Sequence, residues 1–225
     1  QQNYQTHTYY PDGALQSVTD AKGNKTTYEY DGFNRLWKTS FPSKTAAGVS
    51  STTDYEEYTY DAAGNRKTLR KRDGRVISYD YDHLNRMIKK DVPAPDRDVY
   101  YDYDLRDLEI SARFDSTSGP GLHSAYNARG LMKSATSDLT GTTFSYAYDD
   151  ASNRTRVTHP DGIYFTYTPD MLSRLTTISD SNNNVLNQIT YDAQGRLSAI
   201  DHTNRFNWSV GYDPLGRLDA MTIDA

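Results

Sequence analysis

Five histidines are the side chains best suited to bind a transition metal or to transfer protons at neutral pH. They are His7, His83, His123, His159 and His202, and successive histidines stand at least 36 residues apart. No HxH or HExxH pair therefore places two ligands on one local element. The chain has no cysteine, which excludes disulfides and thiolate zinc sites. We predict no metal site and no cofactor.

Other catalytic patterns are also missing from the sequence. It contains no GxSxG nucleophile turn, no Walker phosphate loop and no GxGxxG turn. A calcium loop is suggested by Asp180, Asn182 and Asn184, but Val185 stands where such a loop needs glycine and Tyr191 where it needs glutamate. Most of the 30 acidic residues are explained by repeated turns. We predict no catalytic residues and no enzymatic activity.

The composition favours an all-β protein in which tyrosine replaces the aliphatic residues. Leu, Ile, Val and Phe together account for 37 of 225 residues, a share typical of disordered chains when the net charge is high. Here the net charge is only −5, and 20 tyrosines supply large rings that favour strands. Tyrosine is therefore the expected packing residue.

Charge argues against a nucleic-acid partner, and hydropathy argues against a membrane-spanning segment. A pI near 5.5, with the basic residues spread along the chain, disfavours nucleic acid. No apolar run approaches the roughly 20 residues that span a bilayer. The amino terminus lacks the pattern of a signal peptide, which suggests a mature or excised piece.

One phrase recurs along the whole chain: an aromatic residue, usually Asp, two or three turn residues, then Gly or Asn, Arg and Leu. Ten copies align from Tyr10 to Tyr212, with a mean period of about 22 residues. We predict a single array of about ten repeats over residues 1–225. The aromatic and acidic markers are Tyr10, Tyr30, Asp31, Tyr60, Asp61, Tyr81, Asp82, Tyr103, Asp104, Tyr126, Tyr148, Asp149, Tyr167, Tyr191, Asp192, Tyr212 and Asp213.

Each repeat is predicted to be a β-hairpin. Before the marker, residues alternate as in a half-buried strand, with Thr26, Tyr28 and Tyr30 on one face. The following Asp accepts turn hydrogen bonds, and Gly or Asn tolerates positive φ. Arg and Leu then open a second, antiparallel strand, and we expect the Arg to stack on a neighbouring tyrosine or to pair with the repeat's Asp.

Three details refine this unit. Apolar residues recur three apart, as in Leu15 and Val18 or Leu175 and Ile178, so a β-bulge or a strong twist is needed to place them on one face. A second class of turn is expected to join repeats, as at 20–24 and 180–184. Two insertions, 41–53 and 92–98, are predicted to be surface loops.

The phrase resembles the signature of the Rhs repeat proteins, also called YD-repeat proteins, which is close to YDxxGRL. Two copies match it fully, and partial copies extend from Thr8 to the end of the chain. The residues that complete the two full matches are Gly195, Arg196, Leu197, Gly216, Arg217 and Leu218.

This resemblance implies that the hairpins form one long sheet, curved or spiralling, as part of a hollow β-shell. In that family the shell encloses a toxin domain of the same polypeptide for delivery to another cell. It also implies flanking repeats, secretion-system or toxin-complex partners, and a secreted or cell-surface location in bacteria. We expect a fragment of a longer shell without its own toxin domain, and Asp213 and Pro214 lie in an ordinary repeat, not in a cleavage motif.

A binding module is the main alternative function. Exposed tyrosine rings, together with Trp37 or Trp208, could stack on cell-surface sugars. For both tryptophans, ordinary packing in the sheet is the favoured interpretation. An enzyme is the least favoured alternative, because no catalytic constellation is present.

Overall fold

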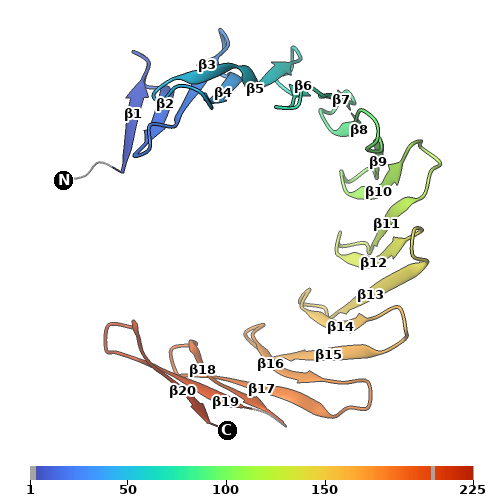
Figure 1. Ribbon diagram of the computed structural model, residues 1–225. Coiled ribbons are helices and arrows are strands. Elements are labelled where there is room, and N and C mark those ends of the chain that lie inside the picture. Colours follow the sequence, from blue (N-terminus) through green and yellow to red (C-terminus); the bar gives the residue numbers. More distant parts are fainter. Residues whose placement is uncertain (1–3, 204–205, 225) are drawn as a thin grey trace. The chain divides into compact units, whose positions relative to one another are not determined.

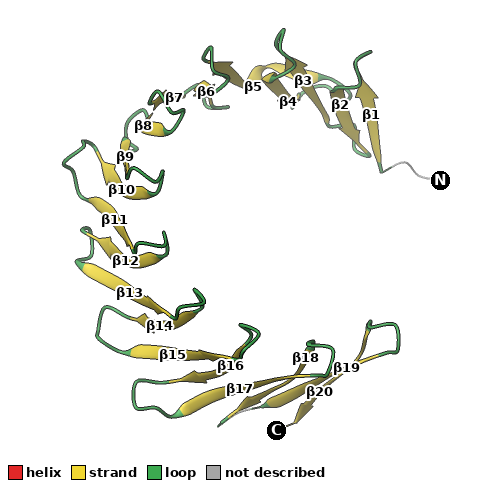
Figure 2. Ribbon diagram, turned by 180° about the vertical axis from the view of Figure 1, so that it is seen from behind, coloured by secondary structure: helices red, strands yellow, loops and turns green. Residues whose placement is uncertain are grey.

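The computed structural model describes residues 4–203 and 206–224, and these contain strands, turns and loops but no helix (Figure 2). The prediction of an all-β fold built from antiparallel hairpins with a period of about 22 residues is confirmed. The chain divides into two compact units, Gln1–Asp102 with Ala112–Gly119, and Tyr103–Ser111 with Pro120–Ala225. No helix of the described part is long and apolar enough to cross a membrane.

In the first unit each strand pairs antiparallel with the next strand along the chain (Figure 1). Its strands are β1 (Gln5–Tyr9), β2 (Leu15–Asp20), β3 (Lys25–Tyr30), β4 (Leu36–Pro42), β5 (Ser50–Tyr60), β6 (Arg66–Arg70), β7 (Val76–Tyr81) and β8 (Met87–Asp91). The strands β9 (Val99–Tyr103) and β10 (Glu109–Phe114) each contribute residues to both units.

The second unit follows the same rule from β11 onwards. Its strands are β11 (Gly121–Tyr126), β12 (Met132–Ser137), β13 (Thr142–Tyr148), β14 (Arg154–Thr158), β15 (Tyr164–Pro169), β16 (Leu175–Ser179), β17 (Val185–Tyr191), β18 (Leu197–His202), β19 (Asn207–Tyr212) and β20 (Leu218–Asp224).

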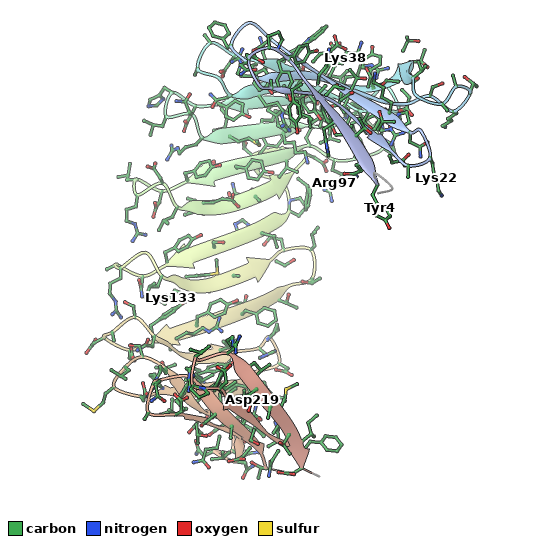
Figure 3. The ribbon with its side chains drawn as sticks, turned by 90° about the vertical axis from the view of Figure 1, so that its left-hand side faces the viewer. Tyr4, Lys22, Lys38, Arg97, Lys133 and Asp219 are labelled. Carbon is green, nitrogen blue, oxygen red and sulfur yellow. The ribbon has the colours of Figure 1, made fainter. Side chains whose placement is uncertain are left out.

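The predicted β-bulge is confirmed. In β1 and β2, Tyr9 pairs with Leu15 but Thr8 pairs with Ser17, which leaves Gln16 as an extra residue. The same shift lies beside the turn of each further marker hairpin whose register is described, and two of the extra residues, Lys133 and Asp219, are labelled in Figure 3. Because paired residues share a face, the bulge places both members of each apolar pair on the face that carries the marker tyrosines. We call this the marker face.

The insertions differ from the prediction in one respect. The segment 92–98 is a loop, as predicted, between β8 and β9. In the first insertion only 43–49 is loop, because β4 continues to Pro42 and β5 begins at Ser50, and these two residues pair. The predicted loop 41–53 was therefore too wide. Its Ser and Thr residues were interpreted as loop, although 41–42 and 50–53 belong to the strands of a longer hairpin.

Little of this sheet is buried. Among the large hydrophobic side chains of the described residues, only Tyr58 and Ile77 are buried, at 9% and 8% exposure. Both lie on the marker face, on either side of Leu69, with which each of them pairs in register. Packing in each unit is therefore mainly lateral, between neighbouring strands and turns.

Candidate functional site

The turn after each marker tyrosine has one recurring five-residue geometry, which we call the marker turn. The N–H of residue 1 donates to the carbonyl of residue 5, and the N–H of residue 4 donates to the carbonyl of residue 1. Residue 4 has positive φ, as in Asn34 (59°) and Gly64 (90°), which explains why Gly and Asn recur there.

Asp at residue 1 closes this turn. One carboxylate oxygen of Asp31 accepts the N–H groups of Phe33 and Arg35, at 2.9 and 3.0 Å. The other oxygen accepts Arg35 Nε at 2.8 Å. The hydrogen bond from the Arg35 side chain is the main reason that the pKa of Asp31 lies below its usual range.

The turns that join repeats at 20–24 and 180–184 have the geometry of the marker turn, so the prediction of a second class of turn is wrong there. Asp20 and Asp180 begin turns with the same backbone bonds and the same Asp contacts. Asp180 also accepts Asn184 Nδ2 at 2.9 Å, so its carboxylate is used by its own turn. In the described part of the chain no group of three or more His, Cys, Asp or Glu residues could hold a metal ion.

Two markers occupy different positions from those that the alignment predicted. Tyr10 is residue 1 of its turn, so Tyr9 is the equivalent of Tyr30. Tyr167 lies two residues before Pro169, which takes the marker place opposite Leu175. The other described markers precede residue 1 directly.

Consecutive repeats meet at what we call a repeat junction, where the turn of one repeat touches the marker tyrosine of the next. The Arg35 guanidinium lies over the Tyr60 ring, 4.4 Å from its centroid, while it also binds Asp31. The Tyr60 hydroxyl donates to the carbonyl of Leu36 at 2.7 Å. The arginine therefore makes both predicted contacts, to the Asp and to a tyrosine ring, at once.

The same junction recurs along the array. Arg174 and Arg196 lie over the rings of Tyr191 and Tyr212, at 4.4 and 4.1 Å. The hydroxyls of Tyr30, Tyr81, Tyr126 and Tyr191 each donate to a carbonyl at the start of the second strand of the preceding repeat. Sequence reasoning missed these hydroxyl bonds, because their partners lie 15 to 24 residues away.

The two tryptophans belong to different units. Trp37 is the extra residue of its bulge, is 38% exposed and lines an open groove beside the first repeat junction. Trp208 is half-buried and lies in register with Ile200 and Ile223 on the marker face of the second unit. Trp37 is thus the more exposed of the two.

The histidines of each unit lie on different strands or turns. His123 pairs with Asp138 at 2.6 Å, and His159 packs edge-on against Phe144 and Phe165. The His123 contact is a side-chain interaction on the sheet surface, and the His159 contacts are packing between aromatic rings.

Removing one junction hydroxyl should have a measurable effect. We expect Tyr60→Phe to lower the free energy of unfolding by about 1 kcal/mol, because the Leu36 carbonyl loses its partner. Urea denaturation followed by circular dichroism measures it. Tyr55→Phe is the matched control, since the Tyr55 ring also contacts cations but its hydroxyl makes no hydrogen bond within the described residues. Equal effects of the two variants would contradict the role of the junction bond.

The marker turns should also make stability depend on acidic pH. The pKa of Asp31 is lower in the folded chain than in the unfolded chain, so its contribution is present above the unfolded pKa of about 3.9 and is lost as pH falls through the folded value. Asp31→Asn should fold with the same turn, because Asn127 accepts the equivalent N–H bonds in its own repeat. We expect this variant to lose less stability than the parent between pH 5 and the acid transition, as a thermal-melt series would show.

These observations define a class of protein: a β-sheet of hairpin repeats joined by tyrosine, arginine and aspartate. Residues 9–46, 60–94 and 126–164 match the family described as RHS Repeat. The chain belongs to the Rhs/YD-repeat family.

Curated relatives include two teneurins. The chain is 25% identical over 202 residues to Teneurin-3 of Danio rerio and 26% identical over 205 residues to Teneurin-4 of Mus musculus. Each alignment covers 84% of this chain but 7% of the relative, so the chain spans a small part of those proteins.

Solved structures of similar fold come from toxin complexes. The crystal structure of TcdB2-TccC3 matches 98% of this chain with a TM-score of 0.63 at 18% identity, over 14% of that chain. The Tc holotoxin pore of Photorhabdus luminescens matches 96%, also with a TM-score of 0.63 at 18% identity, over 13% of that chain. At this identity the likeness is one of fold.

Proposed function

We propose that this chain is a wall segment of an Rhs-type shell, whose function is to enclose a toxin domain of the same polypeptide until delivery to another cell. The proposed location is secreted or at the cell surface, and the proposed partners are flanking repeats, the toxin domain, and secretion-system or toxin-complex proteins. Its role is structural, without catalysis by the repeats themselves.

The observation that carries this proposal is the thin lateral packing of the sheet. Each strand packs on its sequence neighbours, and only two large hydrophobic side chains are buried in the described residues. Such a sheet is stabilised by turns and junctions that repeat, so it can be extended to any length and can form a wall without a thick core. The likeness in fold to chains of Tc toxin complexes supports the same reading.

The proposal is tested on the complete polypeptide that contains these repeats. Its open reading frame should encode many more repeats and a variable carboxy-terminal domain. Limited proteolysis should then leave that domain intact in the native protein and cut it once denaturant opens the repeats. Cleavage of the domain at the rate of the isolated domain would contradict enclosure, as would a reading frame without further repeats.

Binding of cell-surface glycans is a second candidate, favoured by the exposed ring of Trp37 beside Tyr10 and Tyr30. A glycan array tests it, with Trp37→Ala as the comparison. A signal that Trp37→Ala removes would support it, and an array without signal would exclude it.

A further inference from the structure

Three repeat junctions share an arrangement that the first junction only partly has. Residue 5 of the marker turn is Arg35, Arg174 or Arg196 in these three, and its guanidinium covers the marker ring of the next repeat at 4.1 to 4.4 Å. In the first marker turn residue 5 is Ala14, whose methyl group cannot reach across the junction.

The ring that would be covered is nevertheless in place. The Tyr30 hydroxyl donates to the Leu15 carbonyl at 3.0 Å, as the Tyr60 hydroxyl does to Leu36. Both turns and all four strands of this junction lie within the described chain, from β1 to β4. The junction therefore has its tyrosine but lacks its cation.

An open groove of about 500 Å³ occupies this position, and we call it the junction groove. Its lining includes Tyr10, Asp12, Glu29, Tyr30, Asp31 and Trp37. Three of these residues are acidic and no lining residue is basic. The rings of Tyr10 and Tyr30 meet edge to face at 6.1 Å, so the groove combines aromatic walls with negative charge.

Other junctions without arginine do not present this combination. In two of them residue 5 is a large apolar side chain, Leu108 or Leu131. Asn65 crosses its junction and donates to Asn85 Oδ1 at 2.8 Å. At Asn153 the next repeat has Pro169 in the marker place, so no marker ring is there to bind a cation. The junction groove is thus the described junction that joins a marker ring to a residue 5 as small as alanine.

The charges around the groove also favour a cation. Burial, then the neighbouring phenols and the charge of Asp12, raise the pKa of Tyr30, and Asp12 and Tyr30 both line the groove. Asp31 is neutralised by Arg35 at 2.6 Å, whereas Asp12 has no ion pair in the described residues. Lys38, the cross-strand partner of Glu29, lies instead over the rings of Tyr55 and Trp37 at 4.4 and 5.9 Å.

The chain itself shows how a guanidinium would bind an Asp at this position. The turn that begins at Lys71 has Asp at residue 3 and Arg at residue 5, and Arg75 Nε binds Asp73 at 2.8 Å. The first marker turn has Asp12 at the same residue 3. A planar, weakly hydrated guanidinium that binds a carboxylate and stacks on a ring satisfies both partners better than an ammonium does.

We propose that the junction groove binds the guanidinium of an arginine side chain on a partner peptide, with Asp12 as the carboxylate and Tyr30 as the ring. The arginine of the partner takes the place that Arg35, Arg174 and Arg196 fill from within the chain at other junctions. This inference is independent of the proposed shell function.

The test uses the 225-residue chain and two short peptides that differ in one group. Acetyl-Gly-Arg-Gly-amide carries the guanidinium, and acetyl-Gly-citrulline-Gly-amide replaces it with a neutral urea of the same shape. In titrations followed by amide NMR shifts, we expect the arginine peptide to bind saturably at residues 10–14 and 29–37. The citrulline peptide should bind about tenfold more weakly. Equal affinities, shifts elsewhere or no saturable shift would overturn the proposal.

Two variants locate the site. Ala14→Arg should fill the groove from within, raise the melting temperature and abolish peptide binding. Asp12→Asn keeps the oxygen that accepts the Ala14 N–H and should weaken binding several-fold with an unchanged melting temperature. Unaltered binding by a folded Ala14→Arg variant would contradict the site, and if that variant does not fold, unaltered binding by Asp12→Asn decides against it.

Discussion

Replacing Tyr58 with alanine is expected to lower the free energy of unfolding by about 3 kcal/mol. Tyr58 is 9% exposed, so its ring is one of the few in the described sheet that leaves a true void when removed. The Arg66 guanidinium lies over the ring, 4.9 Å from its centroid, and the Tyr58 hydroxyl donates a hydrogen bond to the Glu56 carboxylate at 2.7 Å. Urea denaturation followed by circular dichroism measures the loss.

Tyr58→Phe is the matched control for this prediction. It keeps the ring and removes the hydroxyl, so we expect a loss of about 1 kcal/mol. Burial, reinforced by Glu56, raises the pKa of Tyr58 to about 12, and this variant should therefore remove a phenol that ionises well above the ordinary range in an alkaline absorbance titration. If alanine and phenylalanine cost the same, burial of the ring contributes little and the prediction fails.

Local physics made most of the fold predictable. Alternating tyrosines indicated the strands, and the three-residue spacing of Leu175 and Ile178 indicated a bulge or a strong twist. The structure has a bulge, whose extra residue Thr176 lies opposite Thr168 and Pro169. Because each strand pairs with its neighbour in sequence, short-range patterns determined the topology. No distant pairing had to be guessed in either unit.

The exact place of two markers could not be predicted, for a physical reason. Asp at residue 1 or at residue 3 can accept the N–H of residue 5, as Asp31 does from Arg35 and Asp12 does from Ala14. The same backbone turn can therefore be formed by two sequence patterns, with Asp either at residue 1 or at residue 3. The alignment assumed Asp at residue 1, whereas the turn that begins at Tyr10 has Asp12 at residue 3.

Only part of the candidate site could be predicted from the sequence. The arginine was expected to contact a tyrosine, but Arg35 meets Tyr60 across the insertion that contains 43–49, so spacing alone did not identify the partner. The small side chain of Ala14 becomes informative only when it is compared with the arginine that stands at residue 5 in other marker turns. A cavity made by a small residue has no signature in a single repeat.

Replacing Ile77 with alanine is expected to cost about 2 kcal/mol, and to do so locally. Ile77 is 8% exposed and pairs in register with Leu69, which in turn pairs with Tyr58. Ile88→Ala is the matched control, since Ile88 is 39% exposed as the extra residue of its bulge, and we expect a change within about 0.5 kcal/mol.

The range over which the Ile77 effect spreads tests how the array holds together. Because each strand contacts mainly its sequence neighbours, amide hydrogen exchange should accelerate in β5 to β8 and stay unchanged in β15 to β18. Uniform acceleration along the whole chain would mean that the repeats unfold as one cooperative body. Stability would then depend on the array as a whole, and the energies of single junctions could not be added repeat by repeat.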